Sequence, residues 1–331
     1  MNKLQKAVSG ARFPHAHFEQ AVRAAVSRIT FMPPGSVVAM VGPTRVGKSS
    51  AIRQAVSQAF PTAADGHHPA VVIDCGRTDS GFVSTRYLTL QLLTTLEHPF
   101  YTELGQRTRF SQTETNARLQ LLRTIQHRDT RLIVIDEAHH LLRVKNRGGR
   151  EAALESLKCL GNETGAIIFL VGGYELLSSC FCSAHLNGRL SLIEFPRYGG
   201  DEEQMREFCR ILASYDELLP WAKGHSLLSM RELIYAGSLG SCGLVSSWAL
   251  IAVAEMWVAG APKLKKEHFE KARYQLQMEE IAQDIAYGES VLHPLALPKP
   301  VRSEPQPSIR GRMPRKPGRR NPKRDPVGFA S

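Results

Sequence analysis

Residues 42–49 have the types and spacing of a phosphate-binding loop. They fit the pattern G-x-x-x-x-G-K-[ST], with an apolar run before them and a helical pattern after them. The glycines let backbone N–H groups turn toward phosphates, and the N-terminus of the following helix adds partial positive charge. The lysine of such a loop reaches the β and γ phosphates, and the next hydroxyl ligates Mg²⁺. We therefore predict an ATP and Mg²⁺ site formed by Gly42, Pro43, Thr44, Arg45, Val46, Gly47, Lys48, Ser49 and Ser50.

Two adjacent carboxylates follow a second apolar run, residues 132–135. Asp136 is predicted to bind the nucleotide's Mg²⁺ together with Ser49. Glu137 is predicted to be the catalytic base that orients and deprotonates the attacking water. Phosphoryl transfer needs little beyond positioning and charge compensation, so Lys48 is the other catalytic residue predicted here. We expect the two carboxylates to lie one sheet position away from the loop around Lys48.

Two other interpretations of the acidic segment are weaker. Residues 136–139 also spell the D-E-A-H box of one helicase class, but that class needs a second RecA-like domain with its own arginine motif, and the rest of the chain offers only short helical patterns. His139 and His140 have no ligand spacing that favours a metal, and the six cysteines form no C-x-x-C pair. We therefore predict no metal other than Mg²⁺, and reduced cysteines.

The elements that must position these residues alternate between strands and helices. Near-continuous apolar runs predict strands buried on both faces of a parallel sheet, and the helical patterns between them predict a three-layer α/β P-loop domain over residues 1–199. After residue 199 the apolar spacing becomes helical throughout, which predicts a small all-α lid domain over residues 200–290. The predicted strands cover residues 37–41, 70–74, 132–136, 166–171 and 191–195, and the predicted helices cover 49–60, 113–127, 205–215, 227–235, 244–258 and 264–282.

The positive charge of the chain is concentrated in its last segment. Of the net charge of +11, residues 294–331 contribute +8, because they contain ten Lys or Arg against two acidic residues. They also hold nine of the 19 prolines. Such a segment cannot bury enough apolar surface to offset chain entropy, so residues 291–331 are predicted to be a disordered tail rich in Pro and Arg. The tail could bind DNA nonspecifically or dock a protein partner.

Neither the N-terminal segment nor the apolar stretch at 243–260 predicts a membrane protein. Residues 1–18 lack the apolar core of a signal peptide. The apolar stretch 243–260 contains Glu255 and several serines, so we expect a buried helix there. The predicted location is cytoplasmic.

Three further segments carry a family resemblance: I-D-E-A-H-H-L-L from residue 135, V-G-G-Y-E-L-L from residue 171, and G-R-L-S-L-I-E-F-P-R-Y from residue 188. Together they resemble the TniB/TnsC group of AAA+ ATPases, which regulate DNA transposition. IstB-like helper ATPases and initiator-type loaders are more distant. The resemblance covers roughly residues 13–282.

The resemblance implies a role for an arginine beside the last strand. Arg189 is expected to be the arginine finger that completes the ATP site of an adjacent subunit. Arg197 is a second candidate, and an ordinary ion pair is the alternative for each. Two glycines, at 172 and 173, stand where the family has a polar sensor residue, and residues 243–247 offer hydroxyls in place of a sensor arginine. Both departures predict slow hydrolysis, suited to a switch.

The resemblance also implies partners. Members of the group assemble as ATP-bound rings or filaments on double-stranded DNA and connect a target-recognition protein or complex to a transposase. Lys and Arg side chains can supply the sequence-independent contacts to DNA phosphates, although a solvated charged surface is the alternative. The candidates are Arg143, Lys145, Arg147 and Arg150, expected in a glycine-bearing loop that faces a pore, and Arg118 and Arg123 on the helix at 113–127.

The leading prediction is an ATP-dependent regulator of DNA transposition that links target-site selection to transposase recruitment. The alternative is a replication initiator or helicase loader, which shares the ATPase core. A third possibility is a signalling ATPase that binds only protein. An initiator usually carries a helix-turn-helix or winged-helix domain after the lid, whereas a basic tail follows here, and this difference favours transposition.

Overall fold

The computed structural model describes residues 8, 13–62, 64–75, 84–101, 113–141, 147–180, 190–273 and 278–294. By its internal contacts the chain divides into two units, residues 1–292 and 293–331. Since residues 295–331 lie outside the described part, the fold presented below is that of the first unit.

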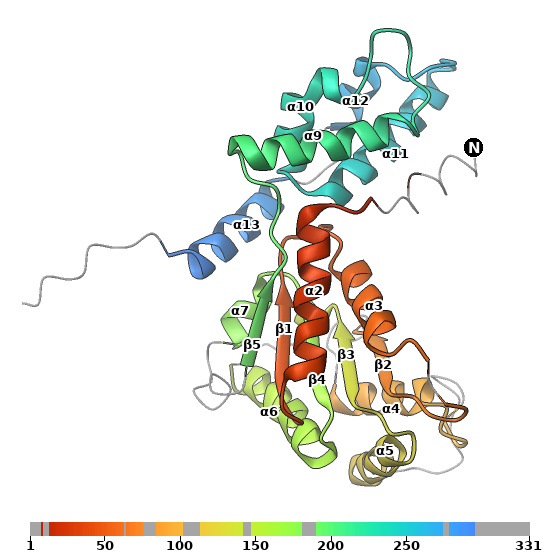
Figure 1. Ribbon diagram of the computed structural model, residues 1–331, viewed down its shortest axis with the longest axis vertical. Helices are drawn as coiled ribbons and strands as arrows, with labels where there is room; N and C mark the ends of the chain where they lie inside the picture. The colour runs from red at the N-terminus through yellow and green to blue at the C-terminus, as the bar shows by residue number, and fades with distance from the viewer. Residues whose placement is uncertain are drawn as a thin grey trace, which may run out of the picture. The chain divides into compact units, whose positions relative to one another are not determined.

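The first half of this unit is an α/β structure around one five-stranded sheet (Figure 1). Each strand pairing is parallel, and the strand order is β2-β3-β4-β1-β5. The elements in chain order are α2 (Ala16–Phe31), β1 (Val37–Val41), α3 (Lys48–Ala59), β2 (Ala70–Asp74), α4 (Thr85–Thr95), α5 (Glu114–His127), β3 (Leu132–Asp136), the 3-10 helix η1 (Ala138–His140), α6 (Arg147–Thr164), β4 (Ile167–Gly172), α7 (Glu175–Cys180) and β5 (Leu190–Glu194).

The alternation of side chains along the strands produces three layers. In β1, Val37, Ala39 and Val41 face one apolar cluster, which is completed by residues of α4, α5, α6 and α7. Val38 and Met40 face the opposite cluster, completed by α2 and α3. Successive side chains of a strand point to opposite faces, so a continuous apolar run is what a sheet covered on both sides requires. The predicted three-layer fold with a parallel sheet is confirmed.

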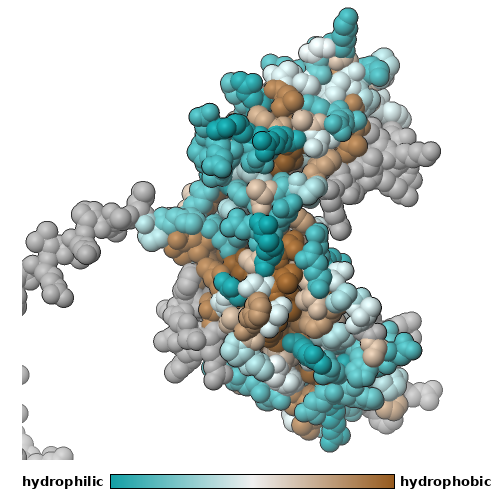
Figure 2. Space-filling model, in the orientation of Figure 1, coloured by the Kyte–Doolittle hydropathy of each residue, from teal (hydrophilic) through white to brown (hydrophobic). Residues whose placement is uncertain are grey.

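The edge strand β5 is less covered than the others. Four of its five residues are only partly buried, whereas β1, β3 and β4 are fully buried. The Arg28 side chain of α2 crosses to β5 and donates to the Ser191 hydroxyl at 2.7 Å. Figure 2 shows apolar residues gathered in the middle of the visible face, where Figure 1 places α2 and β5.

Three expectations about this half need correction. The fourth and fifth strands begin one residue from the predicted positions, at Ile167 and Leu190. β3 and β1 are not neighbours, because β4 lies between them, so the acidic pair stands two sheet positions from the P-loop strand. Arg147 and Arg150 do not lie in a loop, because α6 begins at Arg147. Local sequence patterns determine whether a segment forms a strand, but the order of the strands depends on contacts between segments that are distant in the sequence.

The second half is helical, as predicted from its apolar spacing. Its elements are α9 (Glu202–Asp216), η2 (Leu228–Met230), α10 (Arg231–Ser238), α11 (Cys242–Val258), α12 (Lys266–Arg273) and α13 (Met278–Leu292). α9 to α12 share one apolar cluster, which we call the helical core. The indole of Trp248 is fully buried in this core and donates to the Phe269 carbonyl at 2.9 Å. Where one helix was predicted over 264–282, the structure has two, α12 and α13, with residues 274–277 outside the description.

Among the described residues, no single helix is both long and apolar enough to cross a membrane. One pair, Leu228–Ser238 with Cys242–Val258, meets the length and composition test only together, across a bend of 112°.

Candidate nucleotide site

The residues with candidate chemistry meet at the carboxyl ends of the strands. The register places Asp74 at the end of β2 opposite Asp136 at the end of β3. At the end of β1, Val41 pairs with Gly172 of β4 on one side and with Glu194 of β5 on the other. In open parallel sheets ligands bind in the crevice outside this edge.

The loop that follows β1 is built by two glycines. Gly47 precedes α3 with a φ of 109°, a left-handed conformation that favours glycine, and no side chain caps the helix. Gly42 lies so close to β5 that a Cβ on it would come within 2.2 Å of the Phe195 carbonyl oxygen. The loop is therefore clamped between the sheet and the first turn of α3, whose N–H groups face the loop and favour an anion.

Lys48 is the buried cation of this site. Its side chain is 9% exposed, and its Nζ donates to the Gly42 and Pro43 carbonyl oxygens at 2.9 and 2.6 Å. Burial lowers the pKa of Lys48 to about 8, against the opposite effect of the nearby carboxylates Glu137, Asp284 and Asp136. An ammonium buried in this way gains from a bound phosphate more than an exposed lysine would.

The acidic pair lies at and just after the end of β3, as predicted, but two sheet positions from the P-loop strand. Asp136 is 3% exposed, and one of its carboxylate oxygens accepts from the Glu137 N–H at 3.0 Å. Glu137 has a left-handed backbone with a φ of 53°, which turns the chain sharply into η1. A non-glycine residue in this region is uncommon and often marks a functional position.

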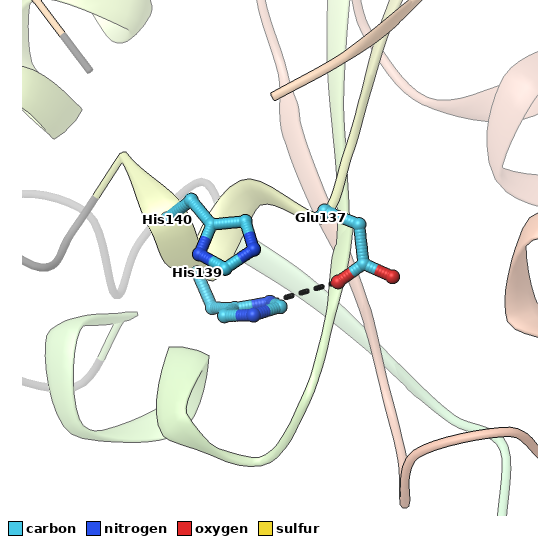
Figure 3. Close-up of side chains that lie close together, drawn as sticks. All are labelled: Glu137, His139 and His140. Atoms are coloured by element: carbon cyan, nitrogen blue, oxygen red, sulfur yellow. Dashed lines mark ion pairs between the residues drawn. The ribbon is translucent and has the colours of Figure 1, made fainter. Parts of the chain in front are cut away.

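Glu137 also contacts the histidines that follow it (Figure 3). Its Oε2 lies 3.2 Å from the Nδ1 of His139, and the rings of His139 and His140 lie with their centroids 4.1 Å apart. Ligand atoms of these three side chains lie within 4.8 Å of one another. Two imidazoles and a carboxylate are donors that zinc accepts. The sequence did not predict this grouping, because the sharp turn at Glu137 is needed to bring the side chains together.

A cavity of about 470 Å³ adjoins the loop and the helical core. Its lining includes Gly47 and Ser50 of the loop and α3, Phe18 of α2, and Ser246 and Leu250 of α11. His15, also in the lining, accepts from the Phe18 N–H and lies 2.8 Å from the Tyr198 hydroxyl, and burial lowers its pKa to about 4. The cavity combines apolar walls with a few polar groups, as small-molecule sites do.

The P-loop residue Arg45 contacts α11 directly. Its carbonyl oxygen accepts from the Gly243 N–H at 2.8 Å, and its guanidinium donates to the Ser247 hydroxyl at 2.7 Å. A Cβ on Gly243 would come within 2.2 Å of the same carbonyl, so only glycine permits this approach. The contact connects the loop to the helical core and forms one wall of the cavity.

The structure places the remaining predicted residues in different settings. Arg189, Arg143 and Lys145 lie outside the described residues, and Arg147 and Arg150 stand in the first turn of α6. Arg118 donates to Glu163 on α6 at 3.3 Å. Arg123 and His127 of α5 line a groove together with Phe100.

For Arg197, the ion-pair alternative is the one observed. Its guanidinium binds Glu289 of α13 through two nitrogens, at 2.7 and 3.2 Å. This pairing raises the pKa of Arg197. No local pattern around Arg197 marks this pairing, because the partner lies 92 residues further along the chain.

The family model of an AAA domain matches residues 34–179. This part of the chain, less than half of it, is thus similar to an AAA domain. The match contains both the loop at Lys48 and the acidic pair at Asp136, which the geometry brings to one edge of the sheet. A search of the curated proteins finds no sequence that matches the chain.

Solved structures show the same fold at low sequence identity. The chain is similar to the ORC1 protein of Aeropyrum pernix in complex with DNA, with a TM-score of 0.59 and 14% identity over 84% of this chain and 71% of that one. The CDC6P protein of Pyrobaculum aerophilum gives 0.57 and 14%, over 81% and 70%. The ORC2 protein of Aeropyrum pernix, with ADPNP and ADP, gives 0.54 and 16%, over 83% and 74%. The P-loop AAA+ fold predicted from sequence is thereby confirmed.

Proposed function

We propose that the chain is an ATPase that binds Mg²⁺-ATP at the AAA domain and uses it to control assembly on double-stranded DNA. One observation carries the proposal: Lys48 is buried within electrostatic reach of Asp136 and Glu137 at the edge of the sheet. A buried ammonium at the N-terminus of the uncapped helix α3, with a buried carboxylate nearby at the end of β3, suits a phosphate and its metal ion. The adjoining cavity has room for the nucleoside part.

The residues divide the chemistry between them. The N–H groups of the loop and α3 together with Lys48 bind the phosphates, and Ser49 with Asp136 hold Mg²⁺, which supplies charge compensation when bound. Glu137 accepts the proton of the water that attacks the γ phosphorus, and the bond to the β-γ bridging oxygen breaks. His139, whose Nδ1 lies 3.2 Å from the Glu137 carboxylate, helps to orient it. Arg189 remains our candidate for a finger supplied to a neighbouring copy of the chain.

Nucleotide binding and hydrolysis are tested separately by two variants. Lys48→Ala should abolish binding of ADP and of ATP, measured by calorimetry, whereas Lys263→Ala, at an exposed lysine, should leave both unchanged. Glu137→Gln should retain binding and slow hydrolysis by at least about a hundredfold, the usual contribution of a general base. Wild-type affinity in Lys48→Ala would refute the site.

The leading proposal for the biological role is regulation of DNA transposition. It rests on the resemblance of the Arg189 segment, the Glu137 segment and the segment after β4 to TniB/TnsC-type ATPases. In this role the ATP-bound chain forms a ring or filament on duplex DNA, and a transposase and a target-recognition protein or complex are its partners. The partly exposed edge strand β5, next to Arg189, is a surface that a second copy could cover.

The second candidate is a replication initiator or helicase loader. Its support is the likeness of the fold to the ORC1 protein that was solved with DNA. The two roles differ in how they choose DNA. Electron microscopy with Glu137→Gln, ATP and random-sequence duplex should show continuous rings or filaments for the first role. Binding confined to particular sequences would favour the second, and a failure to bind DNA with any nucleotide would contradict both.

A further inference from the structure

The C-terminal helix α13 packs against the AAA domain. Its Gly288 lies on the ring of Tyr174, where a Cβ would come within 2.0 Å of the ring carbon Cγ. Val291 and Leu292 pack against the apolar cluster on the α4–α7 side of the sheet. Figure 1 shows α13 beside α7 and the upper end of β5. The helix therefore covers part of the edge at which the nucleotide site lies.

An ion pair fastens α13 in this position. Glu289 accepts two hydrogen bonds from Arg197, which follows β5 and also donates to the Leu239 carbonyl at 3.3 Å. A bidentate arginine–carboxylate pair fixes orientation as well as distance. One turn of helix separates Glu289 from Ile285, the buried residue that follows Asp284.

Asp284 is the residue of α13 that reaches toward the phosphate site. Its Oδ2 would lie 3.9 Å from a Cβ on Gly173, the residue directly after β4. The side chain is partly buried. Burial and the nearby Glu175 raise the pKa of Asp284, whereas Lys48 lowers it. Asp284 therefore shares the field of Lys48 with Asp136 and Glu137, but it comes from a different part of the chain.

We infer that Asp284 sets the selectivity of the site between ATP and ADP by opposing the γ-phosphate. In this inference, which rests on the proposed nucleotide binding, α13 stays docked with ADP and withdraws when a triphosphate is bound. In the proposed mechanism Asp136 binds Mg²⁺ and Glu137 is the general base, whereas Asp284 has neither role. A negative charge near the Lys48 ammonium is favourable without a triphosphate and becomes unfavourable when the γ-phosphate arrives beside the same ammonium.

The expected change in affinity for the triphosphate follows from the charge of Asp284 alone. At an effective dielectric constant of about 20, two unit charges roughly 10 Å apart change an affinity by roughly tenfold. ADP lacks the γ-phosphate that the Asp284 charge opposes in this inference, so the effect on ADP is expected to be smaller. A ligand shifts a conformational equilibrium only by its difference in affinity for the two states, and this difference in charge supplies it.

The test compares ADP with the non-hydrolysable β,γ-imido analogue of ATP, each with Mg²⁺, on the full chain. Asp284→Asn keeps the shape and removes the charge, and should tighten the analogue roughly tenfold while the Kd of ADP changes less than about twofold. Glu280→Gln removes an exposed charge from the same helix and should change neither. Gly288→Ala should undock α13 by collision with Tyr174 and raise the analogue-to-ADP preference as Asp284→Asn does.

Hydrogen exchange of residues 278–292 provides the second readout. In wild type, exchange should be faster with the imido analogue than with ADP, and in Asp284→Asn this difference should disappear. An unchanged ratio of the two Kd values in both Asp284→Asn and Gly288→Ala, or equal exchange in wild type with both nucleotides, would overturn the inference while leaving nucleotide binding intact. A wild-type chain that binds neither nucleotide would instead refute the proposed function and the inference together.

Discussion

The contact between Arg45 and Gly243 offers a steric test of how the helical core acts on the nucleotide site. Replacing Gly243 by alanine would bring a Cβ within 2.2 Å of the Arg45 carbonyl oxygen and 3.1 Å of the Arg45 Cβ. Ordinary contacts begin near 3.4 Å. Neither the Arg45 backbone nor the first turn of α11 can rotate away as a side chain could. The helix must therefore move about 1 Å away from Arg45 to restore normal packing.

The energetic effect follows from the hydrogen bonds at this contact. Withdrawal breaks the bonds from the Gly243 N–H to Arg45 and from Arg45 to Ser247. At about 1 kcal/mol for each hydrogen bond, the state in which α11 contacts Arg45 loses about 2 kcal/mol of stability. If nucleotide binds only when α11 contacts Arg45, its apparent affinity falls in proportion to the fraction of molecules that keep this contact, by up to roughly thirtyfold. The affinities for ADP and ATP should fall alike, because α11 contacts the loop at Arg45 and not the part of the site that would hold the γ-phosphate.

Calorimetry with ADP gives the affinity, and tryptophan fluorescence reports the helical part, which contains all three tryptophans, at 221, 248 and 257. Gly200→Ala is the matched control, since a Cβ there meets nothing closer than the Tyr235 hydroxyl at 3.6 Å. It should bind as wild type. If Gly243→Ala binds ADP with wild-type affinity, the contact does not contribute to the site and the proposed wall of the cavity is wrong.

Three further results are expected. Burial lowers the pKa of Lys48 to about 8 in the free protein, whereas a bound phosphate favours its charged form. Binding above pH 8 must therefore take up a proton, and the affinity for ATP should fall there by up to about tenfold per pH unit. An affinity that stays constant from pH 7 to 9.5 would contradict this. Gly237→Ala would place a Cβ 2.3 Å from the Trp248 ring and should destabilise the helical part to urea by about 1–3 kcal/mol, with wild-type stability as the refuting result. Arg123→Ala should weaken DNA binding equally on all sequences and lower the salt slope by about 1; an unchanged slope would remove Arg123 from the interface.

Much of the fold could be predicted because its signals are local. The run from Val37 to Val41 is apolar at every position, and such a run bounded by a glycine loop has few alternatives to a buried parallel strand. The loop at Lys48 and the acidic end of β3 could likewise be read from adjacent residues, because phosphate and Mg²⁺ binding requires fixed residue types at fixed spacing. The helical part after residue 199 followed from the change of apolar period.

The contributions of distant segments could not be predicted in this way. The position of β4 between β1 and β3 depends on which strands pair, and a strand's own sequence carries almost the same apolar pattern whichever neighbour it has. The turn at Glu137 that brings His139 onto its carboxylate depends on one backbone angle.

By itself, the sequence determined a P-loop AAA+ fold, a phosphate-binding loop with its lysine, and an acidic pair, because each is encoded in neighbouring residues. Tertiary structure alone decided that Gly243 of α11 closes on Arg45, that Arg197 pairs with Glu289, and that Asp284 of α13 enters the field of Lys48. These two contacts and this electrostatic influence join residues between 92 and 236 positions apart. At such separations no periodicity in the sequence marks the partner, because packing, not local spacing, selects it.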